Sequence, residues 1–345
     1  MKIGHINLAR GFRGGERQTQ LLIEALNALT ELDQCLIARR DSDLSPRIKC
    51  LDEDQLRAVK RPYLFNLSAA SDRQLLHAHE AKAGHYALLA NLRYGTPYII
   101  TRRVPNRPKD NFFTRMVYRR ASRIVAISNA IGDYMLDYDD TLNIDVIPSM
   151  QSALPVDQRE AEKIKAQYAG KFIVGHIGAL VNHHKGQQYL IEAARRLQQT
   201  HPQIHFMLLG DGKDGTWLRE SAKDLTNITF SGFVDNVGDY LSIFDMFVFP
   251  SLEEGLGSIL LDVMSFSKPI IASDVDGIPD IIHHEKTGLL VPAKNSDALY
   301  DSIIRLYEDQ TLRHRLASAG HRLVQDYAPE ALSLHYLKLY QELLS

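Results

Sequence analysis

Two charged side chains follow expected strands at the end where parallel sheets bind their ligands. Lys185 comes shortly after the expected strand 172–177, and Glu254 comes after the expected strand 246–249. A lysine at this place can neutralise a diphosphate as a point charge, and a carboxylate can accept hydrogen bonds from sugar hydroxyls. The alternatives are a solvated surface lysine and a glutamate that only complements the dipole of the following helix.

Glycine-rich turns lead into expected helices in both halves of the chain. Gly14-Gly15 precede the helix expected at 16–30, and Gly257 precedes a helix that starts near Ser258-Ile259. Glycine allows close approach of the backbone to a ligand, and the free N–H groups of a helix N-terminus favour an anion. A tight turn without a ligand is the alternative for Gly14-Gly15. The spacing does not fit G-x-G-x-x-G, which weakens a nicotinamide hypothesis.

Imidazole and guanidinium groups follow two expected strands of the first half. His79 lies nearest the end of a buried strand, where it could bind a sugar or orient an acceptor, although a structural histidine fits equally well. Arg102 and Arg103 could hold an acidic acceptor by bidentate hydrogen bonds. The segment 102–123 interleaves arginines with aromatic residues, which is also typical of contact with an anionic membrane or of a solvated helix face.

The composition describes an ordinary globular protein. The chain has 345 residues, of which 45% are hydrophobic and 24% charged, and this excludes disordered, collagen-like and coiled-coil proteins. Two cysteines are too few for a disulfide framework, and we expect a cytoplasmic protein. The net charge of −2 argues against a nucleic-acid partner. The first half has an excess of basic residues and the second half an excess of acidic ones.

Short apolar runs alternate with helical patterns along nearly the whole chain, which is typical of βαβ units and parallel sheets. The sequence therefore predicts an α/β fold with two Rossmann-like, doubly wound parallel-sheet domains that face each other across a cleft. The strands expected in the first domain are 2–8, 34–38, 75–79, 98–101, 123–127 and 144–147. Those expected in the second domain are 172–177, 205–209, 228–230, 246–249, 270–272 and 289–291.

A proline-bounded stretch without hydrophobic periodicity indicates the linker, at about 148–157. We expect the N-terminal, acceptor-side domain at 1–168 and the C-terminal, donor-side domain at 169–326. The segment 327–345 has one apolar helical stripe, and we expect it to pack back on the N-terminal domain.

Several motifs of the chain resemble those of the family 4 retaining glycosyltransferases, also called group 1 glycosyl transferases, which have the two-domain GT-B fold. The resemblance covers nearly the whole chain. Its most specific parts are 249–262, 272–280 and 287–292. The motifs Gly14-Gly15-Glu16 and His77-Ala78-His79 are similar to those of the family but weaker.

The resemblance implies a role for each matching residue. The catalytic residues would be His79, Lys185 and Glu254, and Arg102 and Arg103 remain the candidates for acceptor binding. The donor would be bound by Gly14, Gly15, Lys185, Gly210, Val234, Glu254, Gly257, Ser258, Ile259 and Asp262.

Two positions depart from the family pattern. Ala179 stands where the family has a phosphate-binding arginine, which His184 or Arg13 could replace. Asp262 stands in place of the glutamate that binds the ribose, and its side chain is one methylene shorter.

The resemblance implies retaining transfer of a hexose-type sugar from a nucleotide diphosphate sugar, with a UDP-sugar favoured. The acceptor would be a saccharide of a cell-envelope glycolipid such as lipopolysaccharide core. Lys185, backbone amides and helix dipoles would stabilise the leaving diphosphate, so we expect no metal ion and no other cofactor. We also expect peripheral contact with an anionic membrane at its cytoplasmic face. The alternatives are a GT-B sugar-nucleotide epimerase, a non-catalytic nucleotide-sugar-binding protein and a dinucleotide oxidoreductase.

Overall fold

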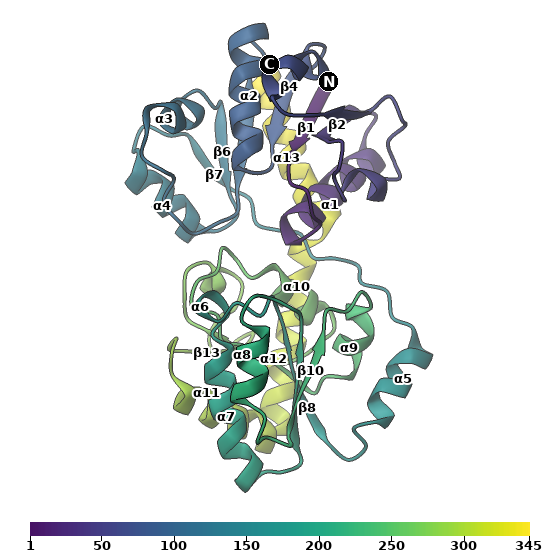
Figure 1. Cartoon of the computed structure of the whole chain (residues 1–345), viewed down its shortest axis with the longest axis vertical. Coiled ribbons are helices and arrows are strands. Elements are labelled where there is room, and N and C mark those ends of the chain that lie inside the picture. Colours follow the sequence, from purple (N-terminus) through teal and green to yellow (C-terminus); the bar gives the residue numbers. More distant parts are fainter. The chain divides into compact units, whose positions relative to one another are not determined.

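The computed structural model describes residues 1–345 and divides them into two compact units. Unit 1 comprises Met1–Met150 and Asp326–Ser345, and unit 2 comprises Gln151–Gln325. Each unit is built around its own parallel sheet with helices packed on it (Figure 1). No helix combines the length and the apolar composition that crossing a bilayer requires.

Unit 1 contains a seven-stranded parallel sheet in the order β3-β2-β1-β4-β5-β6-β7. Its strands are β1 Lys2–Asn7, β2 Asp33–Arg39, β3 Leu56–Val59, β4 Leu75–Ala78, β5 Tyr98–Arg102, β6 Arg123–Ala126 and β7 Ile144–Val146. Its α-helices are α1 Gly14–Leu29, α2 Ala81–Tyr94, α3 Phe112–Arg119, α4 Asn129–Tyr138 and α13 Pro329–Leu344. Short 3₁₀ helices lie at Ser45–Arg47 (η1) and Tyr63–Ala70 (η2), and a third, Val324–Tyr327 (η4), leads into α13.

The C-terminal helix α13 belongs to unit 1 because its apolar stripe is buried there. Leu332, Tyr336, Leu339 and Tyr340 form one core cluster with Leu22 and Leu26 of α1 and with one face of the sheet. Helix α2 packs against β4 and β5, and a Cβ placed on its Gly84 would contact Ile100. Because side chains alternate along a strand, the α13 face and the α2 face receive different residues of β5.

Unit 2 contains a six-stranded parallel sheet in the order β10-β9-β8-β11-β12-β13. Its strands are β8 Phe172–Ile177, β9 Ile204–Leu209, β10 Ile228–Gly232, β11 Met246–Phe249, β12 Ile270–Ser273 and β13 Leu289–Val291. Its α-helices are α5 Gln158–Ala166, α6 Asn182–Lys185, α7 Gln187–Thr200, α8 Gly215–Ser221, α9 Val237–Ile243, α10 Ser258–Ser265, α11 Ser296–Glu308 and α12 Gln310–Leu323, with a 3₁₀ turn at Ile278–Asp280 (η3).

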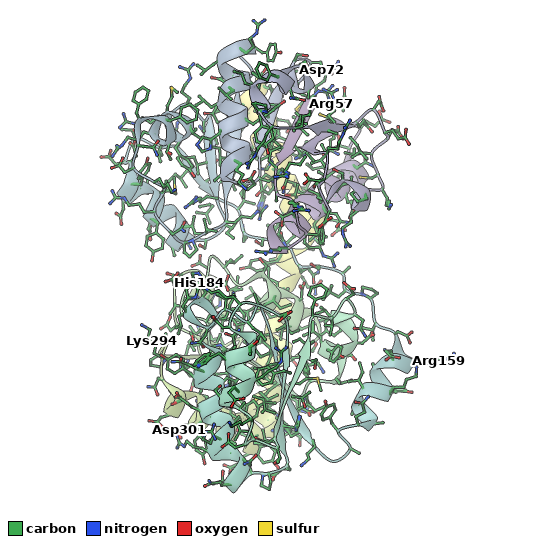
Figure 2. The ribbon with its side chains drawn as sticks, viewed as in Figure 1. Arg57, Asp72, Arg159, His184, Lys294 and Asp301 are labelled. Carbon is green, nitrogen blue, oxygen red and sulfur yellow. The ribbon has the colours of Figure 1, made fainter.

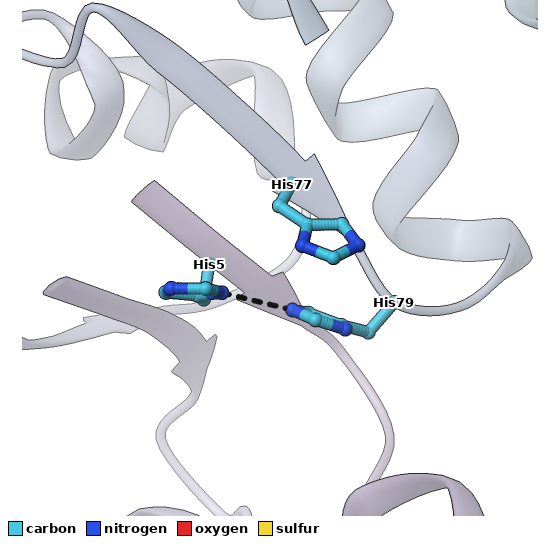
Figure 3. Close-up of side chains that lie close together, drawn as sticks. All are labelled: His5, His77 and His79. Atoms are coloured by element: carbon cyan, nitrogen blue, oxygen red, sulfur yellow. Dashed lines mark hydrogen bonds between the residues drawn. The ribbon is translucent and has the colours of Figure 1, made fainter. Parts of the chain in front are cut away.

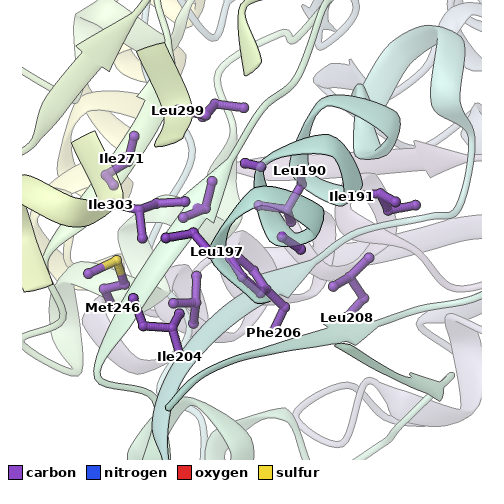
Figure 4. Packing of buried hydrophobic residues seen from close by; sticks show 14 of the residues in the cluster. Leu190, Ile191, Leu197, Ile204, Phe206, Leu208, Met246, Ile271, Leu299 and Ile303 are labelled. Atoms are coloured by element: carbon purple, nitrogen blue, oxygen red, sulfur yellow. The ribbon is translucent and has the colours of Figure 1, made fainter. Parts of the chain in front are cut away.

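The core of unit 2 lies between this sheet and the helices α7 and α11. Leu190 and Leu197 of α7, Phe206 of β9 and Ile303 of α11 point toward one another (Figure 4). All four side chains are fully buried. This packing holds the sheet rigidly, so that the loops at its carboxyl edge start from fixed positions.

All twelve expected strands are present, and two sequence predictions need correction. β3 was missed because Leu56-Arg57-Ala58-Val59 is short, contains a charge and lies at the sheet edge, where burial is incomplete. The expected domain boundary at 168 is wrong, because unit 2 begins at Gln151. Helix α5 packs on α9, and the amide of Asp157 donates to Asp239 at 2.7 Å, which ties this segment to unit 2.

Candidate functional site

Lys185 and Glu254 meet in an ion pair of unit 2. The Lys185 ammonium contacts the Glu254 carboxylate directly, and both side chains are mostly buried but retain about a fifth of their exposure, 21% and 17%. The Lys185 nitrogen also lies 5.0 Å from the centre of the Phe249 ring, the last residue of β11. The two charges predicted from separate motifs are therefore brought together at the carboxyl ends of β8 and β11.

A tight glycine contact places Lys185 beside this edge. Gly186 has a φ of +61°, and a Cβ there would lie 2.2 Å from the carbonyl oxygen of Pro250. The amide of Leu252 donates to the carbonyl of His184 at 2.7 Å, which joins the two loops directly. Only glycine allows this approach, because a side chain would push the loops apart.

The backbone on either side of Glu254 is also held. The Glu254 amide donates to the Asp276 carboxylate at 2.8 Å, and the Gly277 amide donates to the Glu254 carbonyl at 3.3 Å. Asp276 has a φ of +45°, an uncommon conformation for a residue other than glycine. The turn after β12 therefore positions the glutamate that follows β11.

The N-terminus of α10 lies a few residues beyond Glu254. Gly257 adopts a φ of +82° and precedes Ser258 and Ile259, the first two residues of the helix. The first N–H groups of a helix have no partner within it, so these amides can bind an anion. Asp262 is one turn further along, and one of its oxygens accepts a hydrogen bond of 2.6 Å from the Ser152 amide. This tether to the linker was not expected from the sequence.

Gly210 and Val234 follow neighbouring strands of the same sheet. Gly210 directly follows β9 with a φ of +131°, and a Cβ there would lie 2.0 Å from the carbonyl oxygen of Gly178, so the two loops touch. Val234 is half-buried just after β10. His184, named as a substitute for the missing arginine, lies 3.0 Å from Glu253 and is half exposed (Figure 2).

Three histidines of unit 1 form a buried cluster on the α13 face of the sheet (Figure 3). Nδ1 of His5 on β1 lies 3.0 Å from Nε2 of His79, just beyond β4. The His77 ring is 3.9 Å from the His79 ring and bonds the Tyr340 hydroxyl and the Thr101 hydroxyl, each at 2.7 Å. Burial lowers the pKa of His5 to about 4 and the pKa values of His77 and His79 well below 6.5, so all three are neutral at pH 7.

The hydrogen bonds define the tautomers of two of these rings. His5 Nε2 lies 3.0 Å from the Gln34 side-chain oxygen, which only accepts, so His5 carries its proton on Nε2. His5 Nδ1 then accepts from His79 Nε2, which leaves His79 Nδ1 as a lone-pair acceptor. That atom is buried and has no partner in the structure. A hydroxyl or another donor would satisfy it.

One ring nitrogen from each of these histidines lies within 4.8 Å of the others, so the trio is the set that could hold a metal ion. Both nitrogens of His5 and both of His77 already have protein partners. A metal ion would have to replace these hydrogen bonds. The geometry therefore favours a neutral hydrogen-bonded network that joins the sheet to α13.

Arg102 and Arg103 point to opposite faces of the unit 1 sheet, as alternation along β5 requires. Arg102 is buried on the α3 side, where one of its nitrogens donates to the Tyr118 hydroxyl. Arg103 is half-buried near Glu16 and Tyr336, and burial lowers its pKa. The two arginines predicted to hold one acceptor together are thus not brought together.

The expected glycines lie in the first turn of α1, where Gly15 comes close to Arg103. A Cβ on Gly15 would be 3.7 Å from the Arg103 side chain. The Glu16 carboxylate accepts from the Arg13 amide at 3.0 Å and closes this helix start. Arg13 itself is exposed at the edge of the turn.

Sequence reasoning missed several residues that support these sites. Asp276 and Gly186 position the ion pair, and His5, Gln34 and Tyr340 complete the histidine cluster. A signal existed for His5, because it lies on the same strand face as neighbouring core residues and is a polar exception there. The apolar stripe of 327–345 predicted that this helix packs on the N-terminal domain, but it did not indicate the bond between Tyr340 and His77, which is 263 residues away.

Two family models match the chain, one for each half. The model of group 1 glycosyl transferases matches residues 157–323, and the model of a glycosyl transferase 4-like domain matches residues 13–149.

Curated relatives include the lipopolysaccharide core biosynthesis glycosyltransferase LpsE of Rhizobium meliloti, which is 29% identical over 66% of this chain and 66% of its own. A UDP-Gal:alpha-D-GlcNAc-diphosphoundecaprenol alpha-1,3-galactosyltransferase of Escherichia coli is 22% identical over 95% of this chain and 93% of its own. The match to an alpha-D-kanosaminyltransferase of Streptomyces kanamyceticus is 33% identical but covers 42% of this chain and 38% of that enzyme. The LpsE and kanosaminyltransferase matches thus leave a third or more of those relatives unmatched.

Solved structures share the fold over the full chain. Anabaena HepE, crystallised with UDP and glucose, superposes with a TM-score of 0.85 at 19% identity over 99% of this chain and 100% of HepE. A sucrose-phosphate synthase of Thermosynechococcus elongatus superposes with a TM-score of 0.81, also at 19% identity, over 99% of both chains. At this level of identity the likeness shows the GT-B fold.

Proposed function

This chain belongs to the group 1 glycosyltransferases and is a transferase of the GT-B type, and we propose that its donor is a nucleotide diphosphate sugar, with a UDP-sugar favoured. The observation that carries the proposal is the Lys185–Glu254 ion pair beside the N-terminus of α10. This arrangement provides a cation, a carboxylate and free helix amides at the carboxyl edge of the unit 2 sheet. HepE, a protein of the same fold, is described in complex with UDP-glucose, which supports this donor class.

Each group of the ion pair suits one part of such a donor. The Lys185 ammonium and the Ser258 and Ile259 amides would stabilise the diphosphate as negative charge develops on it during transfer. The Glu254 carboxylate would accept hydrogen bonds from sugar hydroxyls. These groups supply the stabilisation from the chain itself, and we propose that transfer needs no divalent ion.

The unit 1 residues would act on the sugar and the acceptor. The unpaired Nδ1 of His79 is an acceptor that a sugar hydroxyl would satisfy. No residue of the chain is identified as a covalent nucleophile. We therefore propose that the acceptor hydroxyl attacks the donor sugar on the face from which the diphosphate departs, which retains the anomeric configuration. The acceptor is proposed to be a saccharide of an envelope glycolipid such as lipopolysaccharide core, as the LpsE and LpsD names suggest. Reaching it would require contact with the cytoplasmic face of an anionic membrane.

A thermal-shift panel tests the donor. The full chain is heated with UDP-glucose, UDP-galactose, UDP-N-acetylglucosamine, GDP-mannose and ADP-glucose. A ligand at 100 times its dissociation constant stabilises the folded state by about 2.7 kcal/mol. We expect at least one UDP-sugar to raise the midpoint, and Lys185→Ala to reduce that rise, whereas the exposed control Lys286→Ala keeps it. The absence of a rise with every compound would contradict the proposal.

Product analysis separates the alternatives. The stabilising donor is incubated with the enzyme, once without an acceptor and once with a glycolipid extract. A new nucleotide sugar would indicate an epimerase, and binding with neither hydrolysis nor transfer to any glycolipid extract would indicate a non-catalytic binding protein. Transfer with the starting anomeric configuration in the product is the result that we expect.

A further inference from the structure

A cavity of about 490 Å³ lies wholly within unit 1 and is separate from the residues assigned to the donor. It is formed by the start of α2, the end of β5, the loop 103–111 and the first turns of α3. Its lining includes His85, Arg102, Arg107, Lys109, Phe113 and Tyr118.

Arg102 is a buried cation in the lining of this cavity. Its side chain forms no ion pair with a carboxylate, and the residue is 7% exposed. One terminal nitrogen donates to the Tyr118 hydroxyl at 3.2 Å, and the other donates to the Asn106 side-chain oxygen at 2.7 Å. Its Nε is buried without a partner. A buried guanidinium normally has an anion beside it, because an unpaired buried charge is strongly destabilising.

Two further cations line the cavity and likewise form no ion pair. Lys109 is exposed, and Arg107 donates to the carbonyl of Asp137 at 3.0 Å, which holds it in place without neutralising it. The nearest acid in this loop, Asp110, is bound to Arg115 at 2.6 Å. The cavity therefore carries a positive charge that the protein does not balance.

Aromatic rings form another part of the lining. The His85 and Phe113 rings lie 5.3 Å apart and tilted by 30°, and Phe113 is 40% exposed. His85 also borders a second cavity with Arg61 and Lys82. A concave site with ring surfaces and a few fixed polar groups is typical of small-molecule binding. An aromatic face beside cations suits a sugar ring that bears a negative group.

We propose that this cavity is the acceptor subsite and that it binds the anionic group, a phosphate or a carboxylate, of a negatively charged saccharide. The inference rests on the proposed function, because it names the acceptor class of that transferase. The buried position of Arg102 favours a group that enters a cavity over the flat surface of a membrane. Arg107 and Lys109 complete the charge around the anion, and Phe113 with His85 supports the sugar ring.

Calorimetric titration of the full chain tests the subsite with glucose 6-phosphate, galacturonate and neutral glucose as probes. We expect glucose 6-phosphate or galacturonate to bind at least tenfold more tightly than glucose. The exposed cations are changed one at a time in Arg107→Ala and Lys109→Ala, and each variant should weaken binding of the anionic probe about tenfold. The control, Arg159→Ala, removes an exposed arginine of unit 2 and should leave binding unchanged (Figure 2).

The buried cation is tested by Arg102→Gln, which should abolish binding of the anionic probe. Arg102 also bonds Asn106 and Tyr118, so the result for this variant counts only if its circular dichroism spectrum matches that of the wild type. If the spectra differ, Arg107→Ala and Lys109→Ala alone test the inference. Equal binding of glucose and both anionic sugars, or anionic binding that neither exposed variant weakens, would overturn the inference.

Two further arms separate this inference from other outcomes. In the first, vesicles containing phosphatidylglycerol are sedimented with each variant. If Arg107→Ala and Lys109→Ala lose vesicle binding but keep full affinity for glucose 6-phosphate, these cations bind the membrane, and the inference is overturned. UDP binding is measured in the same preparations. Failure to bind UDP would contradict the proposed function alone, whereas UDP binding without anion selectivity would contradict the subsite alone.

Discussion

The histidine cluster of unit 1 and the ion pair of unit 2 both collect polar groups near the carboxyl ends of parallel strands, yet they differ in charge and exposure. His5, His77 and His79 are buried and neutral, and most of their nitrogens bond other protein groups. Lys185 and Glu254 keep about a fifth of their exposure and hold opposite charges. A neutral buried network stabilises the fold, whereas a partly exposed ion pair can exchange partners with a charged ligand.

The largest expected effect is on stability and concerns α13. Tyr340→Ala removes a fully buried ring and the partner of His77, and should lower the free energy of unfolding by about 3–5 kcal/mol. Urea unfolding followed by circular dichroism measures it. The control on the same helix is Leu334→Ala, whose side chain is 51% exposed. Equal losses in the two variants would show that the cluster does not anchor α13.

The next effect is on catalysis and concerns the ion pair. Lys185→Ala should lower transfer about 100-fold, equivalent to about 2.7 kcal/mol, because it removes a cation that stabilises the leaving diphosphate. Initial rates with the donor identified by thermal shift measure it, and Lys286→Ala is the matched control. A loss below tenfold would show that Lys185 is not the main charge on the diphosphate.

The pH dependence of stability should reveal the buried histidines. Their folded-state pKa values lie below 6.5, so the unfolded chain binds more protons as the pH falls from 6.5 toward 4. Stability is therefore complete above pH 6.5 and decreases below it, by about 1.4 kcal/mol per pH unit for each histidine. Urea midpoints between pH 7.5 and 5 measure the slope.

Removing one of these histidines tests the origin of that slope. His5→Gln should make the decrease shallower by one proton, even if the variant is less stable at pH 7.5. The control His335→Gln removes an exposed histidine of α13. An unchanged slope in His5→Gln would contradict the assignment of a neutral His5 in the folded state.

The smallest expected effect concerns the backbone that carries Glu254. Asp276→Asn weakens the hydrogen bond from the Glu254 amide and should raise the KM for the donor about fivefold, close to 1 kcal/mol. The exposed Asp301→Asn is the control (Figure 2). A change in the acceptor KM instead would place Asp276 with the other substrate.

Much of the fold could be predicted because most of its strands are short apolar runs that can be identified from neighbouring residues. Met246–Phe249 is apolar over its whole length, and Phe172–Ile177 is apolar except for His176, as is typical of parallel strands buried on both faces. β3 was missed because an edge strand needs no such run. The boundary at Gln151 was missed because α5 is joined to unit 2 through Asp239, a contact across 82 residues.

The sites were predictable where a motif and a strand end coincide. Lys185 and Glu254 each follow a recognisable strand, and parallel strands place their carboxyl ends at one edge. The tether of Asp262 to Ser152 and the unpaired charge of Arg102 were not predictable, because both depend on which distant group lies opposite.

By itself, the sequence determined the two parallel sheets, the glycine turns and the family, since hydrophobic periodicity and short motifs are properties of neighbouring residues. Tertiary structure alone decided that His5, His79 and Tyr340 share one buried network and that Arg102 and Arg103 point to opposite faces of the unit 1 sheet. The physical reason is that burial and hydrogen-bond partners depend on packing between segments far apart in the chain. Burial and partners in turn determine whether an imidazole is charged and whether a guanidinium needs an anion.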